Sequence, residues 1–287
     1  MVNKHIKKIP IRREDSHKGD YGRVFVIAGS PGMTGAAFLA SQGALRCGSG
    51  LVTNGIPESL NSIMEIKLTE CMTLPLTETQ GKTLGVAAEK EIVQFAKKCD
   101  VVALGPGLGI DPETRSLVRK LIQEIDCPLV LDADGINALE GDLDLVKNRK
   151  GRIVLTPHPG ELSRLIEKDI SEIQSKRSDI AKSVAEITGG VVCLKGHRTV
   201  VADPGGEVYV NETGNSGMAT GGMGDILTGM IASFIGQGVG DHSATVLAVY
   251  LHGLAGDIAA EKKGPFNMIA TDVLEYLSEA FGKAGVS

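Results

Sequence analysis

The chain has no tryptophan, and aromatic residues make up only 3% of its 287 residues. Proteins that bind single-stranded nucleic acids stack the bases on aromatic side chains, so this composition disfavours that class. The charge balance points the same way, because 35 Asp and Glu exceed 30 Lys and Arg and give a net charge of −5. Such a chain lacks the electrostatic attraction to phosphate backbones that nucleic-acid binding requires. We therefore expect no nucleic-acid partner.

Long apolar runs and paired cysteines are also missing. No uninterrupted apolar run reaches the ~18 residues that a membrane span needs, and no apolar core of a signal peptide is present. The basic stretch at 5–13 is too short for a transit peptide and is interrupted by Pro10. The five cysteines are scattered and form no CxxC motif, a pattern typical of free thiols in a reducing compartment. We therefore expect a cytoplasmic protein with no membrane partner and no metal site made from cysteines.

Glycine is abundant: 37 of the 287 residues are glycine, about double the average share of ~7%. Short apolar runs alternate with helical patterns along the chain. The predicted strands are 24–28, 50–55, 100–104, 128–132, 153–156 and 191–195. The predicted helices are 34–46, 87–97, 112–124, 171–188 (with Ser171 as its cap), 226–235, 243–261 and 270–281. Near-continuous apolar strands separated by helices are typical of a parallel sheet covered on both faces.

Residues 199–209 break this alternation, because two strand-like runs flank a turn there. This pattern predicts an antiparallel hairpin at the edge of the sheet. The sequence contains no linker, low-complexity tract or internal repeat. We therefore predict an α/β fold in which residues 1–287 form a single domain, with a central, mostly parallel sheet, helices on both faces and an edge β-hairpin.

The most informative stretch is 214–229 (GNSGMATGGMGDILTG). A glycine-rich turn that leads into a helix can direct backbone N–H groups at an anion such as phosphate. Asp225 follows the last close glycine pair, and two roles are open to it: a catalytic carboxylate beside the anion, or an ordinary helix N-cap. The chain has no P-loop motif, and 29–35 matches the dinucleotide-binding fingerprint only loosely.

Ligands of open α/β sheets bind outside the carboxyl ends of the strands, and five predicted strands end in glycine-rich or polar segments. His158 lies on a stiff turn between two prolines, which favours a contact role. Glu161 could cap the next helix or lie near a nucleotide-bound metal. Lys195 follows a buried strand, where desolvation favours a bound phosphate. His252, within an apolar run, is expected to be a hydrogen-bonded core histidine.

These segments together resemble the nucleotide-dependent NAD(P)H-hydrate dehydratases. The resemblance rests on HKGDYG at 17–22, AGS at 28–30, GPGLG at 105–109, DADGINAL at 132–139, LTPHPGE at 155–161, KGHRT at 195–199 and GGMGDILTG at 221–229. It implies a ribokinase-like fold. It also implies repair of the hydrated cofactors NADHX and NADPHX, driven by ADP in the bacterial type or by ATP in the eukaryotic type.

The resemblance also implies site residues. The hydrated nicotinamide nucleotide would contact Ala40, Gly107, His158 and Asp225. The adenine nucleotide would contact Lys195, Gly196, His197, Arg198, Thr199 and Gly224. Mg²⁺ would bridge the phosphates without a dedicated set of protein ligands, and the enzyme would be a homo-oligomer, a homotetramer in related proteins.

Two features depart from the pattern of the family. Met223 stands in the glycine turn where a small residue is more usual. Members often carry an epimerase domain ahead of this region, whereas about twenty residues precede Lys18 here. We therefore expect any epimerase to be a separate protein.

The resemblance gives Asp225 the role of the base that accepts the hydroxyl proton of the hydrated ring as that oxygen attacks the terminal phosphorus. Two alternatives stay open. A small-molecule kinase of the same fold, acting on a thiazole, a hydroxymethylpyrimidine or a sugar, would use the same aspartate and glycine turn. A nucleotide-binding regulator without turnover would not need Asp225.

Overall fold

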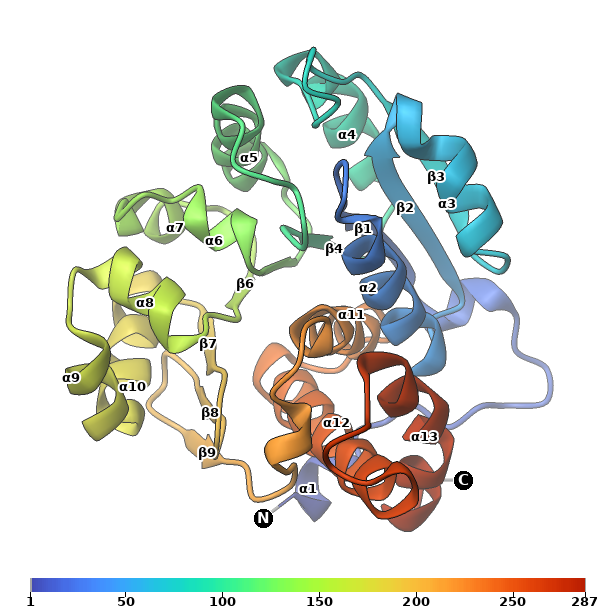
Figure 1. Ribbon diagram of the computed structural model, residues 1–287, viewed down its shortest axis with the longest axis vertical. Helices are drawn as coiled ribbons and strands as arrows, with labels where there is room; N and C mark the ends of the chain where they lie inside the picture. The colour runs from blue at the N-terminus through green and yellow to red at the C-terminus, as the bar shows by residue number, and fades with distance from the viewer. Residues whose placement is uncertain (1, 287) are drawn as a thin grey trace.

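The computed structural model describes residues 2–286, and a nine-stranded sheet runs through this part of the chain in the order β3-β2-β1-β4-β5-β6-β7-β8-β9 (Figure 1). The strands are β1 (Arg23–Ile27), β2 (Leu51–Pro57), β3 (Met72–Leu76), β4 (Val101–Leu104), β5 (Leu129–Leu131), β6 (Ile153–Leu155), β7 (Val191–Leu194), β8 (Val200–Ala202) and β9 (Val208–Val210). The pairs among β1 to β7 are all parallel, whereas β8 and β9 are antiparallel to their neighbours. The predicted parallel sheet with an edge hairpin is confirmed.

Helices cover both faces of the sheet (Figure 1). One core is formed with α2 (Thr34–Arg46), α3 (Asn61–Lys67), α11 (Met223–Gly236), α12 (Asp241–Lys263) and α13 (Ala270–Lys283). The other is formed with α4 (Glu89–Ala96), α5 (Pro112–Glu124), α7 (Leu143–Lys147), α8 (Pro159–Ile166), α9 (Ile170–Ser175) and α10 (Arg177–Thr188). Strand β1 shows how both cores are filled, because Val24 and Val26 enter the first core while Phe25 and Ile27 enter the second.

The predicted helices agree with the structure to within two residues at each end, except at two places. The helix expected at 171–188 is two helices, α9 and α10, which meet at Lys176, and the N-cap of α9 is Asp169 rather than Ser171. Helix α11 begins at Met223, three residues before its predicted start. Strand β3 was not predicted, because it is partly exposed and contains Pro75, which weakens the strand signal.

Helix α12 is long and apolar enough to cross a membrane by length and composition, although no uninterrupted apolar run of that length occurs. Of its most apolar stretch, 78% is buried inside the fold. Burial of this kind is typical of the core helix of a globular domain.

Glycine residues let α11 approach α2 closely. A Cβ atom on Gly229 would lie 1.9 Å from the carbonyl oxygen of Ala40, and one on Gly43 would lie 2.5 Å from that of Ile226. Only glycine avoids these clashes, so the two backbones nearly touch. This contact fixes the position of α11, and with it the position of Asp225 near the start of the helix.

Candidate active site

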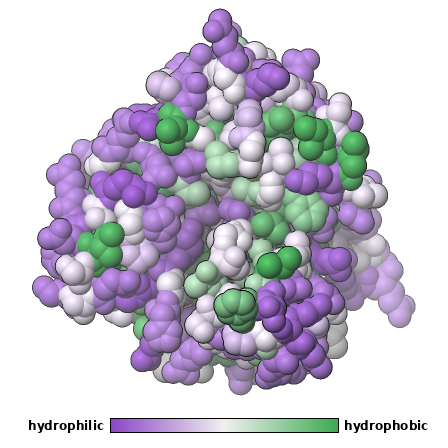
Figure 2. Space-filling view, in the orientation of Figure 1, coloured by the Kyte–Doolittle hydropathy of each residue, from purple (hydrophilic) through white to green (hydrophobic). Residues whose placement is uncertain are grey.

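Polar side chains from four segments converge where the central parallel strands end. Asp132 follows β5, Glu161 lies in α8, Lys195 follows β7, and Asp225 is in the first turn of α11. In the space-filling view the molecule is hollowed near its centre, in the region where Figure 1 places α11 opposite β6 and α8 (Figure 2). The strand ends therefore meet the start of α11 at this hollow, as the strand-end rule predicts.

The start of α11 is shaped for an anion. Gly222 is the N-cap residue, its φ is 91°, and no side chain caps the helix. Asp225 is the third residue of the helix, so its interpretation as the N-cap is wrong. Gly221 has open space where a Cβ atom would stand, and helix geometry leaves the first N–H groups of α11 without partners inside the helix. This turn can therefore present free N–H groups to a phosphate.

The environment of Asp225 suits a proton acceptor. Burial raises the pKa of its carboxyl to about 6, the nearby carboxylate of Asp132 adds to this shift, and Lys195 opposes it. A base is most effective when its pKa lies near the working pH. The carboxylate of Asp225 is thus mostly ionised at neutral pH and more basic than an exposed aspartate.

Asp132 is the centre of a buried network. It is 1% exposed and accepts hydrogen bonds from Thr156 Oγ1 (2.8 Å to Oδ1) and Thr228 Oγ1 (2.7 Å to Oδ2). Its Oδ1 atom also forms an ion pair with Lys195 Nζ. Because Thr228 lies three residues after Asp225 on α11, this network joins the lysine to the helix that carries the aspartate.

Lys195 is held at the start of α11. A Cβ atom on Gly224 would lie 3.3 Å from its Nζ atom, and Glu161 Oε2 lies 3.9 Å from the same Nζ. Burial disfavours the charged form of Lys195, but Asp132 and Glu161 outweigh burial and raise its pKa. A lysine that follows a buried strand needs a negative charge nearby. In this structure the carboxylate of Asp132 supplies that charge.

Glu161 and His158 cap α8 reciprocally. His158 Nδ1 accepts from the N–H groups of Gly160 (2.9 Å) and Glu161 (3.2 Å), while His158 N–H donates to Glu161 Oε2 (2.8 Å). The capping role of Glu161 is therefore confirmed. Burial raises the pKa of Glu161 to about 7, with Lys195 opposing. The imidazole of His158 stays half exposed, and its Nε2 atom lies 3.3 Å from Glu161 Oε1, so a ligand can reach the exposed face of the ring.

Residues 196–199 form the turn between β7 and β8. Thr199 Oγ1 donates to the carbonyl of Gly196 (2.9 Å), and the side chains of His197 and Arg198 are exposed. Gly196 and Arg198 have φ values of 130° and 55°. Beneath the turn, Arg177 donates to the carbonyls at 194 (2.7 Å) and 195 (3.2 Å). No sequence motif had indicated this supporting arginine.

The remaining predicted site residues are buried. Gly107, with a φ of 63°, lies against α2, where a Cβ atom would be 2.9 Å from the Cβ of Ala36. Ala40 is fully buried where α2 packs on α11. His252 is a core histidine as predicted, but its Nε2 atom has no hydrogen-bond partner among residues 2–286. The structure thus brings Lys195 and Asp225 together and leaves Ala40 beneath the surface.

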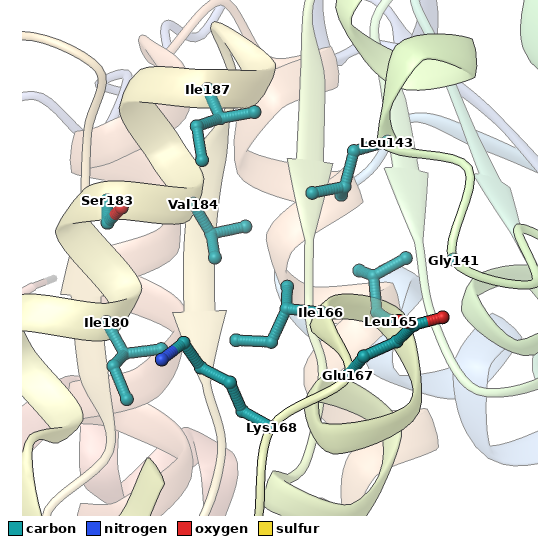
Figure 3. A pocket seen from close by; sticks show the side chains of 10 residues that line it. All are labelled: Gly141, Leu143, Leu165, Ile166, Glu167, Lys168, Ile180, Ser183, Val184 and Ile187. Carbon is teal, nitrogen blue, oxygen red and sulfur yellow. The ribbon is translucent and has the colours of Figure 1, made fainter. Parts of the chain in front are cut away.

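Two cavities lie near α8 without containing Asp225 or Lys195. One, of about 430 Å³, has Glu161 in its wall together with Ile110, Arg115 and Asn137. The other, of about 420 Å³, lies between α8 and α10 and is lined largely by aliphatic side chains such as Leu165 and Val184 (Figure 3). None of the predicted site residues lines the second cavity.

Comparison with known proteins decides the family. The model of the family described as NAD(P)H-hydrate dehydratase matches residues 24–279. The chain belongs to this family. It is 46% identical over 270 residues to the bifunctional NAD(P)H-hydrate repair enzyme Nnr of Moorella thermoacetica, covering 94% of this chain and 51% of that protein. It is 37% identical over 258 residues to the ADP-dependent (S)-NAD(P)H-hydrate dehydratase of Neisseria meningitidis, covering 88% of this chain and 82% of that protein.

Solved structures agree with the family membership. The ADP/ATP-dependent NAD(P)H-hydrate dehydratase of Bacillus subtilis, co-crystallized with ATP/Mg²⁺, superposes with a TM-score of 0.83 at 31% identity, covering 99% of this chain and 97% of that chain. A ribokinase-like superfamily protein from Enterococcus faecalis gives a TM-score of 0.82 at 26% identity, covering 100% of this chain and 96% of that chain. The predicted ribokinase-like fold is thus confirmed. The chain spans about half the length of the bifunctional relatives it matches.

Proposed function

We propose that this family member converts NADHX and NADPHX back to NADH and NADPH, using ADP or ATP as the phosphoryl donor. The observation that carries the proposal is the position of Asp225 in the first turn of α11. There a carboxylate whose pKa is raised to about 6 lies beside a glycine turn open to phosphate and beside Lys195. A phosphate site needs the glycine turn but no carboxylate, so Asp225 is best explained as a base.

The proposed reaction has two steps. Asp225 accepts the proton of the ring hydroxyl while that oxygen forms a bond to the terminal phosphorus, and the bond from phosphorus to the departing nucleotide breaks. The N–H groups at the start of α11 and the ammonium of Lys195 stabilise the charge on the transferred group. Phosphate then leaves with the C–O bonding electrons, the ring loses a proton, and NAD(P)H is restored.

The proposed contacts follow the resemblance, and the position of Lys195 beside Gly224 at the start of α11 supports them. Lys195, Gly196, His197, Arg198 and Thr199, with Gly224, hold the adenine nucleotide, and His158 contacts the hydrated cofactor. Gly107 and Ala40, which are both buried in the structure, support that side of the site from beneath the surface. For the phosphate contact, Lys195 exchanges at least part of its bond with Asp132 for a phosphate oxygen.

Mg²⁺ would bind this site mainly through the phosphates of the nucleotide, with few direct contacts to the protein. Such sites hold the ion through one or two carboxylates, several waters and the substrate phosphates. Asp132 is already bonded to Lys195 and two threonine hydroxyls, which leaves Glu161 to hold Mg²⁺ through water. When bound, Mg²⁺ would neutralise part of the phosphate charge.

One assay tests the activity and separates it from the kinase alternative. The protein is incubated with NADHX or NADPHX and either ADP or ATP, and the absorption of the reduced nicotinamide ring is followed. We expect recovery of NAD(P)H only with a nucleotide. If the protein instead phosphorylates a thiazole, a hydroxymethylpyrimidine or a sugar and ignores NADHX, the dehydratase proposal is wrong. A likeness to hydroxyethylthiazole kinase at 16% identity and a TM-score of 0.62 concerns the fold alone.

We further propose that residues 1–287 act as one domain in a cytoplasmic homo-oligomer, a homotetramer, with no nucleic-acid or membrane partner. Support for an oligomer comes from large apolar side chains that are exposed on this chain, such as Ile66 (83%) and Phe266 (96%). Light scattering during gel filtration tests this, and a monomer at micromolar concentration would contradict it.

A further inference from the structure

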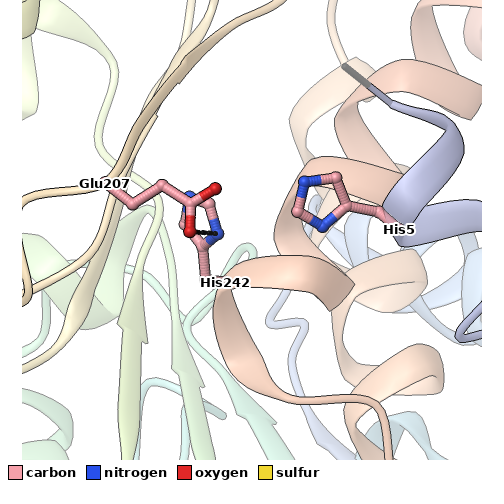
Figure 4. Close-up of side chains that lie close together, drawn as sticks. All are labelled: His5, Glu207 and His242. Carbon is pink, nitrogen blue, oxygen red and sulfur yellow. Dashed lines mark ion pairs between the residues drawn. The ribbon is translucent and has the colours of Figure 1, made fainter.

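A cluster of metal-ligand side chains lies outside the candidate active site, between the N-terminal segment and the edge hairpin. His5 belongs to α1 (Asn3–Ile6), Glu207 precedes β9, and His242 is at the start of α12. One ligand atom from each lies within 4.8 Å of the other two. Figure 4 shows the imidazole of His5 turned toward Glu207 and His242. Three separate segments thus bring two imidazoles and one carboxylate together.

Both histidines of this cluster are largely buried. His5 is 3% exposed, and the side chain of His242 is 11% exposed. Imidazole is the commonest metal ligand among side chains, and these two rings lie on different elements that meet here.

The ring nitrogens are also available. His242 Nδ1 lies 3.8 Å from Glu207 Oε2, beyond hydrogen-bond distance, and its buried Nε2 has no hydrogen-bond partner among residues 2–286. His5 Nδ1 lies 3.0 Å from Ser243 Oγ. A His5 that binds metal through Nε2 would donate its Nδ1–H to this hydroxyl, whose oxygen can accept this bond as well as the one from Lys8 (2.8 Å), so Ser243 can serve as the outer partner that orients the ring.

We propose that His5, Glu207 and His242 form a zinc site that ties the N-terminal segment to the edge hairpin and to α12. Two imidazoles and one carboxylate are a common zinc set, whereas Mg²⁺ and Ca²⁺ prefer oxygen ligands alone. Zn–N distances of about 2.0–2.1 Å place tetrahedral ligands about 3.4 Å apart, so the side chains need to move by about 1 Å. Lys4 now pairs with Glu207 Oε1 at 2.5 Å, but its side chain is 60% exposed and can turn away.

The test measures zinc binding by titration calorimetry on the full chain after treatment with EDTA. We expect one Zn²⁺ per chain with micromolar or tighter affinity. His242→Ala and Glu207→Gln should each weaken binding at least about ten-fold. His17→Ala is the matched control, because His17 is exposed and outside the cluster, and it should bind as the wild type does. Wild-type affinity no tighter than millimolar, or undiminished binding in both ligand variants, would overturn the proposal.

Two further readouts make the result specific. The cobalt-substituted protein should show the visible bands of a tetrahedral site without a thiolate charge-transfer band, and a thiolate band would place the metal at a cysteine instead. Zinc should raise the melting temperature of the wild type but not of His242→Ala. In EDTA, Glu207→Gln should melt as the wild type does, which separates a lost ligand from a damaged fold.

Discussion

Removal of the charge of Asp132 tests the buried network beneath the active site. In Asp132→Asn, Lys195 would keep its charge, with a side chain only 16% exposed, and lose its nearest anion. Breaking a buried pair by removing one partner costs about 3–5 kcal/mol, because it leaves an uncompensated charge. We therefore expect a loss of at least about 3 kcal/mol. At about 2 °C per kcal/mol for a chain of this size, the melting temperature should fall by at least about 6 °C.

A double variant separates charge from packing. Asp132→Asn with Lys195→Met removes both charges at similar volume, a change that is often neutral, so most of the lost stability should return. Asp142→Asn is the matched control, because Asp142 pairs with Arg119 on the surface, and it should change the melting temperature little. Calorimetric melting of these three variants and of Lys195→Met alone is the assay. The expectation fails if Asp132→Asn melts as the wild type does. It also fails if the stability losses of Asp132→Asn and Lys195→Met simply add in the double variant, because the two charges then do not stabilise each other.

Three further predictions concern catalysis and binding. Asp225→Asn should keep nucleotide binding but lose about 10²-fold or more in kcat, and activity within a few-fold of wild type would contradict the role of base. Lys195→Ala should weaken the binding of ADP or ATP, measured by calorimetry, far more than the binding of adenosine. Equal weakening of all three would indicate a role in folding alone. The kcat/KM of the wild type should fall as pH drops through about 7 to about 6, because the carboxyls of Glu161 and Asp225 become protonated with pKa values of about 7 and 6. In Glu161→Gln this fall should move toward pH 6, and an unchanged profile would show that Glu161 does not contribute.

The fold was predictable because its signals are local. Apolar strands buried on both faces, such as β4 with every residue buried, differ from amphipathic helices in their sequence period. The exceptions are set by contacts between distant residues. The start of α11 depends on the positive φ of Gly222, and the break at Lys176 divides a pattern that reads as one continuous helix.

The sequence located the segments that form the site, but it did not show which of their side chains bond to one another. Motifs located Lys195, His158 and Asp225, and the strand-end rule placed them at one edge. That Asp132 neutralises Lys195 and also accepts from Thr228 depends on how β5, β7 and α11 pack together. No single segment carries that information. The approach of His5 to His242, 237 positions apart, is likewise a product of tertiary packing.

The most direct test of the account counts phosphate against reduced cofactor. With NADHX and ADP or ATP, inorganic phosphate and NADH should appear together in equal amounts, and neither should appear without nucleotide or with Asp225→Asn beyond about one hundredth of the wild-type rate. A kinase would instead accumulate a stable phosphorylated product. NADH that appears without an equal amount of phosphate, or phosphate released without NADH, would contradict phosphorylation of the hydrated ring followed by elimination.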